Sequence, residues 1–181
     1  MNIIDGRLLS EEGLILSEVV DPSVLERIYA LRVDAWRETI SVAPQITRWT
    51  DEVDATARHW AVKLGDRVVA AARLSVHPTV AEVPHAEIYS GVVEYLEPLI
   101  GSLNRCVVHP EFRGKSLSEV LDRSRIDAAK ARGCRSVIMS APDPRRAAKM
   151  ISEGFGFRGE GPRTPSGFLK GNQNLVFVLD L

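Results

Sequence analysis

The chain has 181 residues, of which 45% are hydrophobic and 26% charged, and its formal net charge at pH 7 is −1. A chain of this length buries enough apolar surface to fold without disulfides or metals, so we expect one domain over 1–181. The near-neutral charge argues against a protein that binds nucleic acid or a membrane surface, and the sequence has neither the pattern of a signal peptide nor an apolar run approaching a span of about 20 residues, so we expect a cytoplasmic protein.

The first predicted elements are a strand and an amphipathic helix. The strand covers 14–20, and Asp21 caps a helix whose first position is Pro22. A loop over 41–54 and a short helix from Thr50 to about Arg58 follow. Apolar residues that recur at the helical period predict the buried face of the first helix: Leu25, Ile28, Leu31, Val33 and Trp36.

The rest of the chain predicts a hairpin and alternating strands and helices. The hairpin covers 59–78 with its turn at Gly65 and Asp66. The further elements are a short helix over 86–100, a strand over 102–109, a helix over 114–132, a strand over 134–141, a helix over 145–153 and strands over 155–161 and 174–181. This order predicts an α/β fold, with one mixed, mostly antiparallel sheet flanked by helices on both faces.

The stretch CVVHPEFRGKSLSEVL, residues 106–121, joins a strand, a turn and the start of a helix. A helix N-terminus exposes unpaired amides and about half a positive charge. Gly114 allows a ligand to approach closely, and Arg113 and Lys115 add two cations. A nucleotide P-loop is excluded because His109 stands where its first glycine is required, and the chain has no GxGxxG. The stretch therefore predicts a site for an anion of pyrophosphate size.

This stretch resembles the acyl-coenzyme A signature of the GNAT superfamily of N-acetyltransferases, in which a strand and a Pro-containing turn lead into Arg/Gln-x-x-Gly-x-Gly/Ala. Arg113 matches the first position, and Ser116 and Ser118 occupy the two small-residue positions. The segments WAVKLGDRVVAAARLSVHP, CRSVIMSA and RRAAKMISEGFGFRGEG resemble the family's central hairpin, its splayed strand, and its late helix and strand. The resemblance covers about 14–181 and implies the acyl-CoA N-acyltransferase fold.

The resemblance also implies an activity: an acyl-CoA-dependent N-acyltransferase that moves an acetyl group to a primary amine of a small molecule by direct attack. Acetyl-CoA or another acyl-CoA would be the cosubstrate, no metal is expected, and the family allows a homodimer. The strand would hydrogen-bond the pantetheine arm, and the amides at the helix start would hold the pyrophosphate. These expected cofactor-binding residues are Arg105, Cys106, Val107, Val108, Arg113, Gly114, Lys115, Ser116, Leu117 and Ser118.

Two departures from the family pattern affect the expected chemistry. Serine at 116 is tolerable in a phosphate site if its backbone is already helical with negative φ. Two alternatives stay open for its side chain: the hydroxyl donates to a phosphate, or it crowds the site and weakens binding. The family's acidic tyrosine, four residues before a Gly-Phe pair, is replaced by Ser152 or, with the earlier pair, by Met150. Ser152 could at most hydrogen-bond the sulfur. The expected catalytic residues are Ser152, Asn104 on the strand that lines the acyl site, and Glu87 as a base acting through water. Of the neighbours Asn104 and Arg105, one side chain is expected to face the cleft, and either of them fits.

The acid-rich loop over 47–60 is the predicted acceptor site, with Asp54 and His59 as substrate-binding residues for a cationic amine. Their spacing on a helix is expected to make the two side chains face different ways. The alternative is structural: Asp51 and Glu52 cap a helix, and the other charges form surface pairs. Two alternatives also stay open for the whole protein. One is an N-acyl amino acid or homoserine-lactone-type synthase that takes its acyl group from a carrier protein. The other is a non-catalytic acyl-CoA-binding module, which the missing tyrosine favours.

Overall fold

The computed structural model describes residues 7–8, 13–37, 45–141, 143–163 and 173–181. The chain forms two compact units, one from 1–74 and 104–125 and the other from 75–103 and 126–181. Strands β4 (Arg67–His77) and β5 (Ile100–Val108) and helix α2 (Leu117–Ala131) each run from one unit into the other. Every residue of the candidate anion site and of the predicted acceptor loop belongs to the first unit.

The first unit is built on strands in the order β1-β2-β3-β4-β5. Each strand from β1 to β3 pairs antiparallel with the next one along the chain. The first three strands are β1 (Arg7–Leu8), β2 (Leu14–Val19) and β3 (Arg58–Leu64). The hairpin turn lies at Gly65, whose φ is +57°, as its sequence predicted. Such left-handed backbone favours glycine because no Cβ is present to clash.

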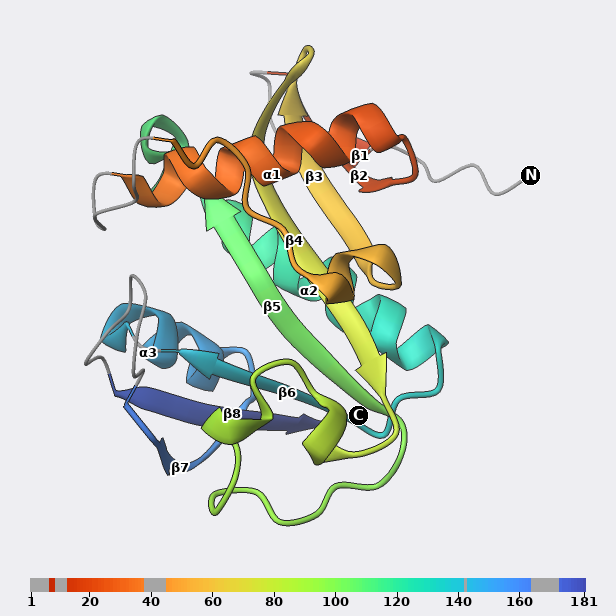
Figure 1. Ribbon diagram of the computed structural model, residues 1–181, viewed down its shortest axis with the longest axis vertical. Helices are drawn as coiled ribbons and strands as arrows, with labels where there is room; N and C mark the ends of the chain where they lie inside the picture. Colours follow the sequence, from red (N-terminus) through yellow and green to blue (C-terminus); the bar gives the residue numbers. More distant parts are fainter. Residues whose placement is uncertain (1–6, 9–12, 38–44, 142, 164–172) are drawn as a thin grey trace. The chain divides into compact units, whose positions relative to one another are not determined.

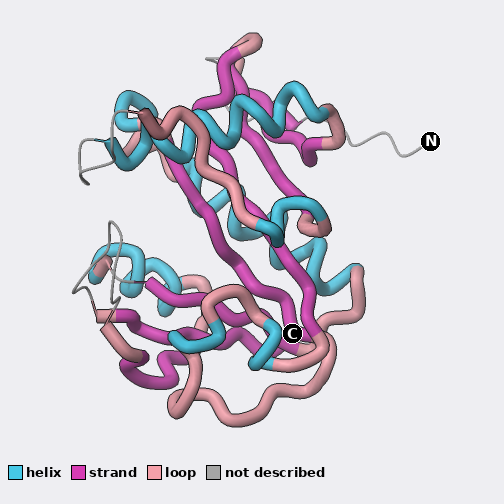
Figure 2. The backbone as a smooth tube through the Cα atoms, viewed as in Figure 1, coloured by secondary structure: helices cyan, strands magenta, loops and turns pink. Residues whose placement is uncertain are grey.

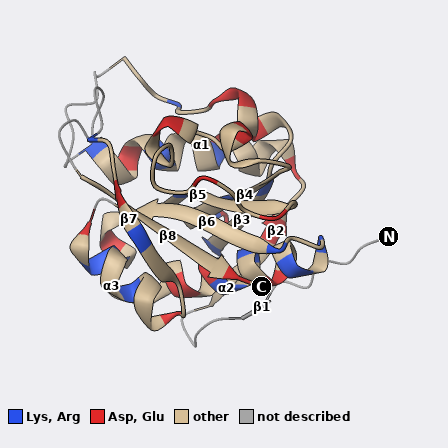
Figure 3. Ribbon diagram, turned by 90° about the horizontal axis from the view of Figure 1, so that it is seen from below, with Lys and Arg blue, Asp and Glu red and all other residues tan. Residues whose placement is uncertain are grey.

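Two helices cover the two faces of these strands in the first unit. Helix α1 (Pro22–Arg37) begins where the sequence predicted, with the Asp21 carboxylate accepting from the Ser23 amide at 2.8 Å. Figures 1 and 3 show α1 on one face and α2 on the other. Acidic and basic positions are interspersed along both helices, so neither presents a surface of one charge sign (Figure 3).

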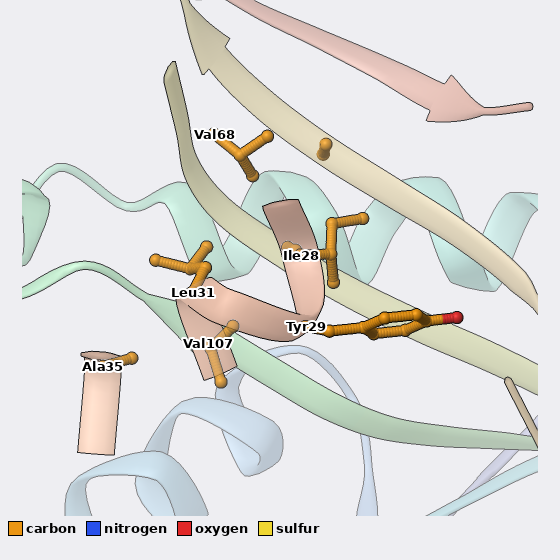
Figure 4. Packing of buried hydrophobic residues seen from close by; sticks show 8 residues of the cluster. Ile28, Tyr29, Leu31, Ala35, Val68 and Val107 are labelled. Atoms are coloured by element: carbon orange, nitrogen blue, oxygen red, sulfur yellow. The ribbon is translucent and has the colours of Figure 1, made fainter. Parts of the chain in front are cut away.

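The core of the first unit lies between α1 and the strands (Figure 4). The predicted apolar face of α1 supplies Ile28 and Leu31, which are 1% and 4% exposed, and Val68 and Val107 meet them from β4 and β5. Burial of such side chains contributes roughly 1.5–3 kcal/mol each. This packing fixes α1 against the strands that carry the candidate site.

The second unit carries strands in the order β5-β6-β8-β7. Strand β6 (Ser136–Ala141) is parallel to β5, from Ile100↔Ser136 to Ser102↔Ile138, whereas β8 (Asn174–Asp180) is antiparallel to both β6 and β7 (Gly156–Gly161). Helix α3 (Pro144–Ser152) begins at Asp143, whose carboxylate accepts from the Arg145 amide. The predicted fold class, a mixed and mostly antiparallel sheet with flanking helices, is confirmed.

Three predicted helices differ from the structure. The short helix from Thr50 to about Arg58 forms only the 3₁₀ turn η1 (Glu52–Ala55), and Arg58 already belongs to β3. The helix over 86–100 is wrong: only short 3₁₀ turns form, η2 (Val80–Glu82) and η3 (Ala86–Ile88), and the rest is loop (Figure 2). Its apolar residues are buried against β5, β6 and β8 instead, so tertiary packing overrides the helical pattern. The helix predicted from 114 begins at Leu117, because Gly114 and Ser116 have positive φ. The predicted loops over 41–54 and between β7 and β8 lie partly outside the described residues.

Candidate active site

The turn between β5 and α2 has a backbone shaped to receive an anion. After η4 (Pro110–Phe112), Gly114 has a φ of +82° and Ser116 a φ of +55°, so left-handed residues stand on either side of Lys115. Alternating backbone hand turns successive amides toward one point, which makes an anion-binding concavity called a nest. The condition set for Ser116 from the sequence, a helical backbone with negative φ, is therefore not met, and its side chain leaves a left-handed backbone.

The amides of this turn are only partly used by the protein. The Arg113 amide donates to the Pro110 carbonyl at 3.2 Å, so this expected phosphate ligand is already bonded. Among the residues that the structure describes, the amides of Gly114, Ser116 and Leu117 have no protein acceptor. A Cβ built on Gly114 would meet nothing within 4 Å, which leaves space over the turn. These three amides are therefore available as donors to a ligand, and the backbone at Gly114 has open space beside it.

The Arg113 side chain has a structural contact that its sequence position did not predict. Its Nη2 donates to the carbonyl of Ala35 in the last turns of α1, at 2.7 Å. The guanidinium therefore ties the turn to α1 and satisfies a carbonyl near the end of that helix. A phosphate would therefore have to bind to the remaining guanidinium nitrogens of Arg113.

A buried charge cluster lies in the same unit, centred on Asp54 in η1 (Glu52–Ala55). Two nitrogens of Arg32 donate to the two Asp54 oxygens at 2.8 and 2.9 Å, and Arg73 Nη1 adds a third bond at 2.8 Å. Thr50 Oγ and the Asp51 amide donate at 2.9 Å each. Burial opposes ionisation of Asp54, but these hydrogen bonds and the charges of Arg32 and Arg73 outweigh it and hold its pKa well below the ordinary value.

Asp51 links this buried centre to the surface. One of its oxygens accepts from Arg73 Nη1, and the other accepts from Arg105 Nε and Nη2 at 3.1 and 2.6 Å. Its side chain also accepts from the Val53 amide, so the predicted helix cap is present as well. The capping expected in the structural alternative is therefore present, and the same carboxylates also pair with arginines of the chain.

Asn104 and Arg105 are neighbours in β5, yet both side chains reach the cluster. Asn104 Oδ1 accepts from Arg73 Nε at 2.5 Å, while Arg105 pairs with Asp51. Successive residues of a regular strand point to opposite faces. Arg105 has a φ of +52°, and this left-handed backbone interrupts the alternation as in a β-bulge. The sequence predicted that one of the two side chains would face the site, whereas the structure brings both there.

His59, the other predicted substrate ligand, is buried beside Asp54. Its Nε2 lies 3.2 Å from the Asp54 carbonyl oxygen, and its Nδ1 is buried with no partner among the described residues. Burial lowers the pKa of His59, although the hydrogen bond to Asp54 partly opposes this. Asp54 and His59 were expected to face different ways because of their spacing, and this expectation is wrong: the start of β3 turns the ring back toward η1.

Two other predicted catalytic residues belong to the second unit. Glu87 lies in η3 with its side chain 65% exposed, and its carboxylate is 3.4 Å from His85 Nδ1. Ser152 is the last residue of α3, and its hydroxyl donates to the Lys149 carbonyl at 2.7 Å. Met150, the alternative at the family's tyrosine position, is fully buried.

The sequence reasoning missed the buried arginines Arg32, Arg73 and Arg125, each at most 1% exposed. Arg125 reaches from α2 to the other face of the strands, where its Nη1 donates to the carbonyls of Arg73 and Asn104 at 3.0 and 3.2 Å. A signal was present: Arg73 interrupts the apolar run VVAAARLSV, and Arg32 follows Leu31 on an apolar helix face. Arginine is almost never fully buried unless it is paired, so such positions predict buried partners.

Comparison with known families identifies the chain. The model of the acetyltransferase (GNAT) family matches residues 25–157, a span that includes α1 from Leu25 onward, the charge cluster, the turn at Gly114 and Ser116, and α3. The protein belongs to this family of N-acetyltransferases, as the signature in 106–121 predicted. A search of curated proteins found no match.

Several solved structures share the fold of this chain. The CoA-dependent acyl-homoserine lactone synthase BjaI has a TM-score of 0.71 and 18% identity, over 93% of this chain and 83% of BjaI. An agmatine N-acetyltransferase mutant has a TM-score of 0.66 and 14% identity, over 93% and 99% of the two chains. FeeM, an N-acyl amino acid synthase from uncultured soil microbes, has a TM-score of 0.64 and 11% identity, over 92% and 90%. These likenesses show the fold.

No helix in the described part of the chain is both long enough and apolar enough to span a membrane.

Proposed function

We propose that this protein transfers an acyl group, with acetyl the first candidate, from an acyl-CoA to a primary amine of a small molecule by direct attack. The observation that carries the proposal is the nest at Gly114 and Ser116, which opens α2 directly after β5. When bound, the acyl-CoA supplies an activated thioester: a C–N bond to the amine forms, the C–S bond breaks, and the proton lost by the amine ends on the released thiol.

The chain's own part in this reaction is to bind and to position. The amides of Gly114, Ser116 and Leu117 would hold the diphosphate, and the Lys115 ammonium would add charge. Residues 106–108 of β5 lie beyond its last paired residue with β6, Ser102, and their backbone would hydrogen-bond the pantetheine arm as an added strand. Holding both reactants in place removes much of the entropic barrier.

The predicted substrate-binding and catalytic residues would have different roles. Asp54 accepts five hydrogen bonds within the protein, so we assign it and His59 a positioning role, in which they hold Arg73 and Asp51. Asn104 would stand beside the acyl group on β5. Glu87 and Ser152 stay candidates for the proton transfers, with Ser152 limited by the bond its hydroxyl already makes.

Titration of the purified protein with coenzyme A and acetyl-CoA tests the binding step. Ser116→Asp places a carboxylate in the nest and should abolish binding. Ser23→Asp makes the same change at the exposed start of α1 and is the matched control. Thiol release with a panel of amines then tests transfer. No heat from either ligand at high micromolar concentration would reject the proposal, whereas tight binding without thiol release would favour the non-catalytic binding module.

A second candidate is an acyltransferase that takes its acyl group from a carrier protein. The positive φ of Ser116 favours this candidate, because the serine side chain occupies space beside the nest that a glycine would leave open for the phosphates of coenzyme A. Comparing acyl-carrier protein with acyl-CoA of the same chain length separates the two donors. Faster transfer from the carrier protein, with Ser116→Gly increasing the use of acyl-CoA, would support this candidate.

A further inference from the structure

We propose that Arg105, with Trp49 beside it, binds a carboxylate of the acceptor, so that the acceptor is an amine that also carries a carboxylate, such as an α-amino acid. This inference rests on the proposed function for the identity of the acceptor, but the carboxylate site can be tested without any transfer. Three independent features of the described residues carry it: the charge balance of the cluster, the free edge of Arg105, and the backbone that presents it.

The buried cluster has one positive charge too many. Among the described residues, Arg32, Arg73 and Arg105 pair with two carboxylates, Asp51 and Asp54, and Arg125 pairs with Asp122 on the other face of the strands. The remaining acid of the segment, Glu52, is exposed. A buried charge without a counter-charge is costly, and charges inside proteins are normally paired. A bound carboxylate would complete the pairing.

Arg105 is the member of the cluster that a ligand can reach. Its side chain is 17% exposed, whereas those of Arg32 and Arg73 are each 1% exposed. Asp51 occupies the side edge of the guanidinium, through Nε and Nη2 on a single oxygen. Nη1 has no acceptor among the described residues, so the end edge formed by Nη1 and Nη2 is open. That edge matches a carboxylate with two parallel hydrogen bonds.

The Trp49 indole ring lies against the Arg105 guanidinium. The Arg105 guanidinium carbon lies 4.7 Å from the centre of the Trp49 ring. The Trp49 backbone is held in place, because its amide donates to the Tyr29 carbonyl and its carbonyl accepts from Arg32 Nη1. An aromatic face against a guanidinium restricts the direction in which the fork points. A carboxylate bound there would therefore contact or closely approach the indole.

The backbone at Arg105 indicates why the side chain is in this place. A φ of +52° is strained for a non-glycine residue, and such strain persists where the surrounding structure holds a residue for a purpose. Here it turns the guanidinium to the same side as Asn104 and next to residues 106–108, where the donor would pair. The acceptor carboxylate would then be anchored one or two residues along the strand from the acyl group.

The test compares ligands that differ by the carboxylate alone: leucine with isopentylamine, and phenylalanine with 2-phenylethylamine. The readout is the ¹H–¹⁵N signal of the Trp49 indole in the full-length protein, assigned with Trp49→Phe. We expect the amino acids to shift this signal and the plain amines to leave it unchanged. Arg105→Gln should weaken amino-acid binding by about 10- to 100-fold, the range for a hydrogen-bonded charge, and Arg105→Lys should retain part of it.

Arg58→Gln is the matched control. Arg58 makes the same two kinds of contact elsewhere, with Glu18 at 2.6 Å and over the Trp60 ring at 5.0 Å, so its loss should not change the Trp49 response. If Arg105→Gln does not fold, the comparison of ligand pairs on the wild-type protein still decides. Equal shifts by both members of a pair, or none at tens of millimolar, would overturn the inference.

Thiol release separates this inference from the proposed function. Faster release with the plain amine than with its amino acid would overturn the carboxylate site while leaving the acyltransferase intact. A carboxylate-dependent Trp49 shift in a protein that binds no acyl-CoA would support the carboxylate site and reject the proposed donor.

Discussion

Arg105 and Asp51 are 54 positions apart, yet two guanidinium nitrogens of Arg105 lie 2.6 and 3.1 Å from one oxygen of Asp51. This pair connects β5 to the segment before β3 at the edge of a buried cluster whose centre is Asp54. Burial lowers the pKa of the Arg105 guanidinium, while Asp51 acts in the opposite direction. The pair therefore belongs to one electrostatic unit that also contains Arg32 and Arg73, and the stability of the fold should depend on it.

The first prediction concerns Asp54. Asp54→Ala leaves Arg32 and Arg73 buried with too few carboxylates, so we expect the free energy of unfolding to fall by about 3–5 kcal/mol. Glu26→Ala removes the partner of Arg48, in a pair more than half exposed, and should change it by less than about 1 kcal/mol. Urea denaturation of the two variants measures the difference. Similar losses in both would contradict a dominant role for the buried cluster.

The second prediction concerns pH and His59. Burial lowers the pKa of this ring in the folded state below its ordinary 6.5, so the unfolded chain takes up the proton first as pH falls. The stability from the neutral ring is thus complete above pH 6.5 and declines as pH falls toward the folded-state pKa. His59→Gln should flatten the decline between pH 6.5 and 5.5 in urea denaturation. An unchanged slope in His59→Gln would refute the assignment.

Asp51 and Asp54 also make the free energy of unfolding decrease as pH falls, but in stronger acid than His59. Burial raises the pKa of both carboxyls, but the arginines prevail and leave them below the ordinary value of 3.8. Their contribution to stability is present above about pH 3.8 and is lost as pH falls further. Asp51→Asn should remove part of this steep acid limb, which circular dichroism during acid titration would detect.

The third prediction compares two cations of the turn. Arg113→Ala should weaken coenzyme A binding more than Lys115→Ala, because a planar guanidinium can bond two oxygens at once. It should also lower the melting temperature, since the bond from Arg113 to the Ala35 carbonyl is lost. Titration calorimetry and thermal melts of both variants test the two effects. Equal weakening by both changes, with equal melting temperatures, would mean that the cations act only as a diffuse field.

The fourth prediction uses the two left-handed residues of the nest. Ser116→Gly should raise the free energy of unfolding by about 1 kcal/mol, because glycine adopts a positive φ without a Cβ clash. Gly114→Ala should lower it by a similar amount through the backbone alone, since its Cβ would meet no neighbour. Coenzyme A binding should persist in the first variant and weaken in the second. Opposite stability changes would show that the turn does not have this conformation.

The sequence predicted what depends on local pattern and failed where distant residues decide. Asp21, Pro22 and the apolar period of α1 determine that helix locally. The motif beginning at Arg113 indicated the family, and it indicated that a helix follows, although α2 begins only at Leu117. The segment over 86–100 has a helical pattern, but it packs its apolar residues on a sheet formed by strands far away in the chain. Sequence reading could not show this competing contact.

The candidate site divides in the same way. The nest follows from the family pattern, although the positive φ of Ser116 does not follow from the residue type. The convergence of Arg32, Asp54 and Arg73 requires α1, η1 and β4 to be placed first. The one sequence feature that indicated this cluster was the presence of arginines in apolar segments. Charged residues in such segments indicate that partners exist, but not which ones.

The left-handed residue in β5 also affects how this strand can change during evolution. Asn104 points to the α1 face, where it accepts from Arg73 Nε, and Val107, two residues after Arg105, points to the same face. Arg105 therefore acts as an extra residue between two correctly phased halves of the strand. A chain lacking this one residue would keep Val107 in the hydrophobic core and lose the guanidinium. Deletion at this single position thus offers relatives a route by which acceptor choice could change while the architecture stays the same.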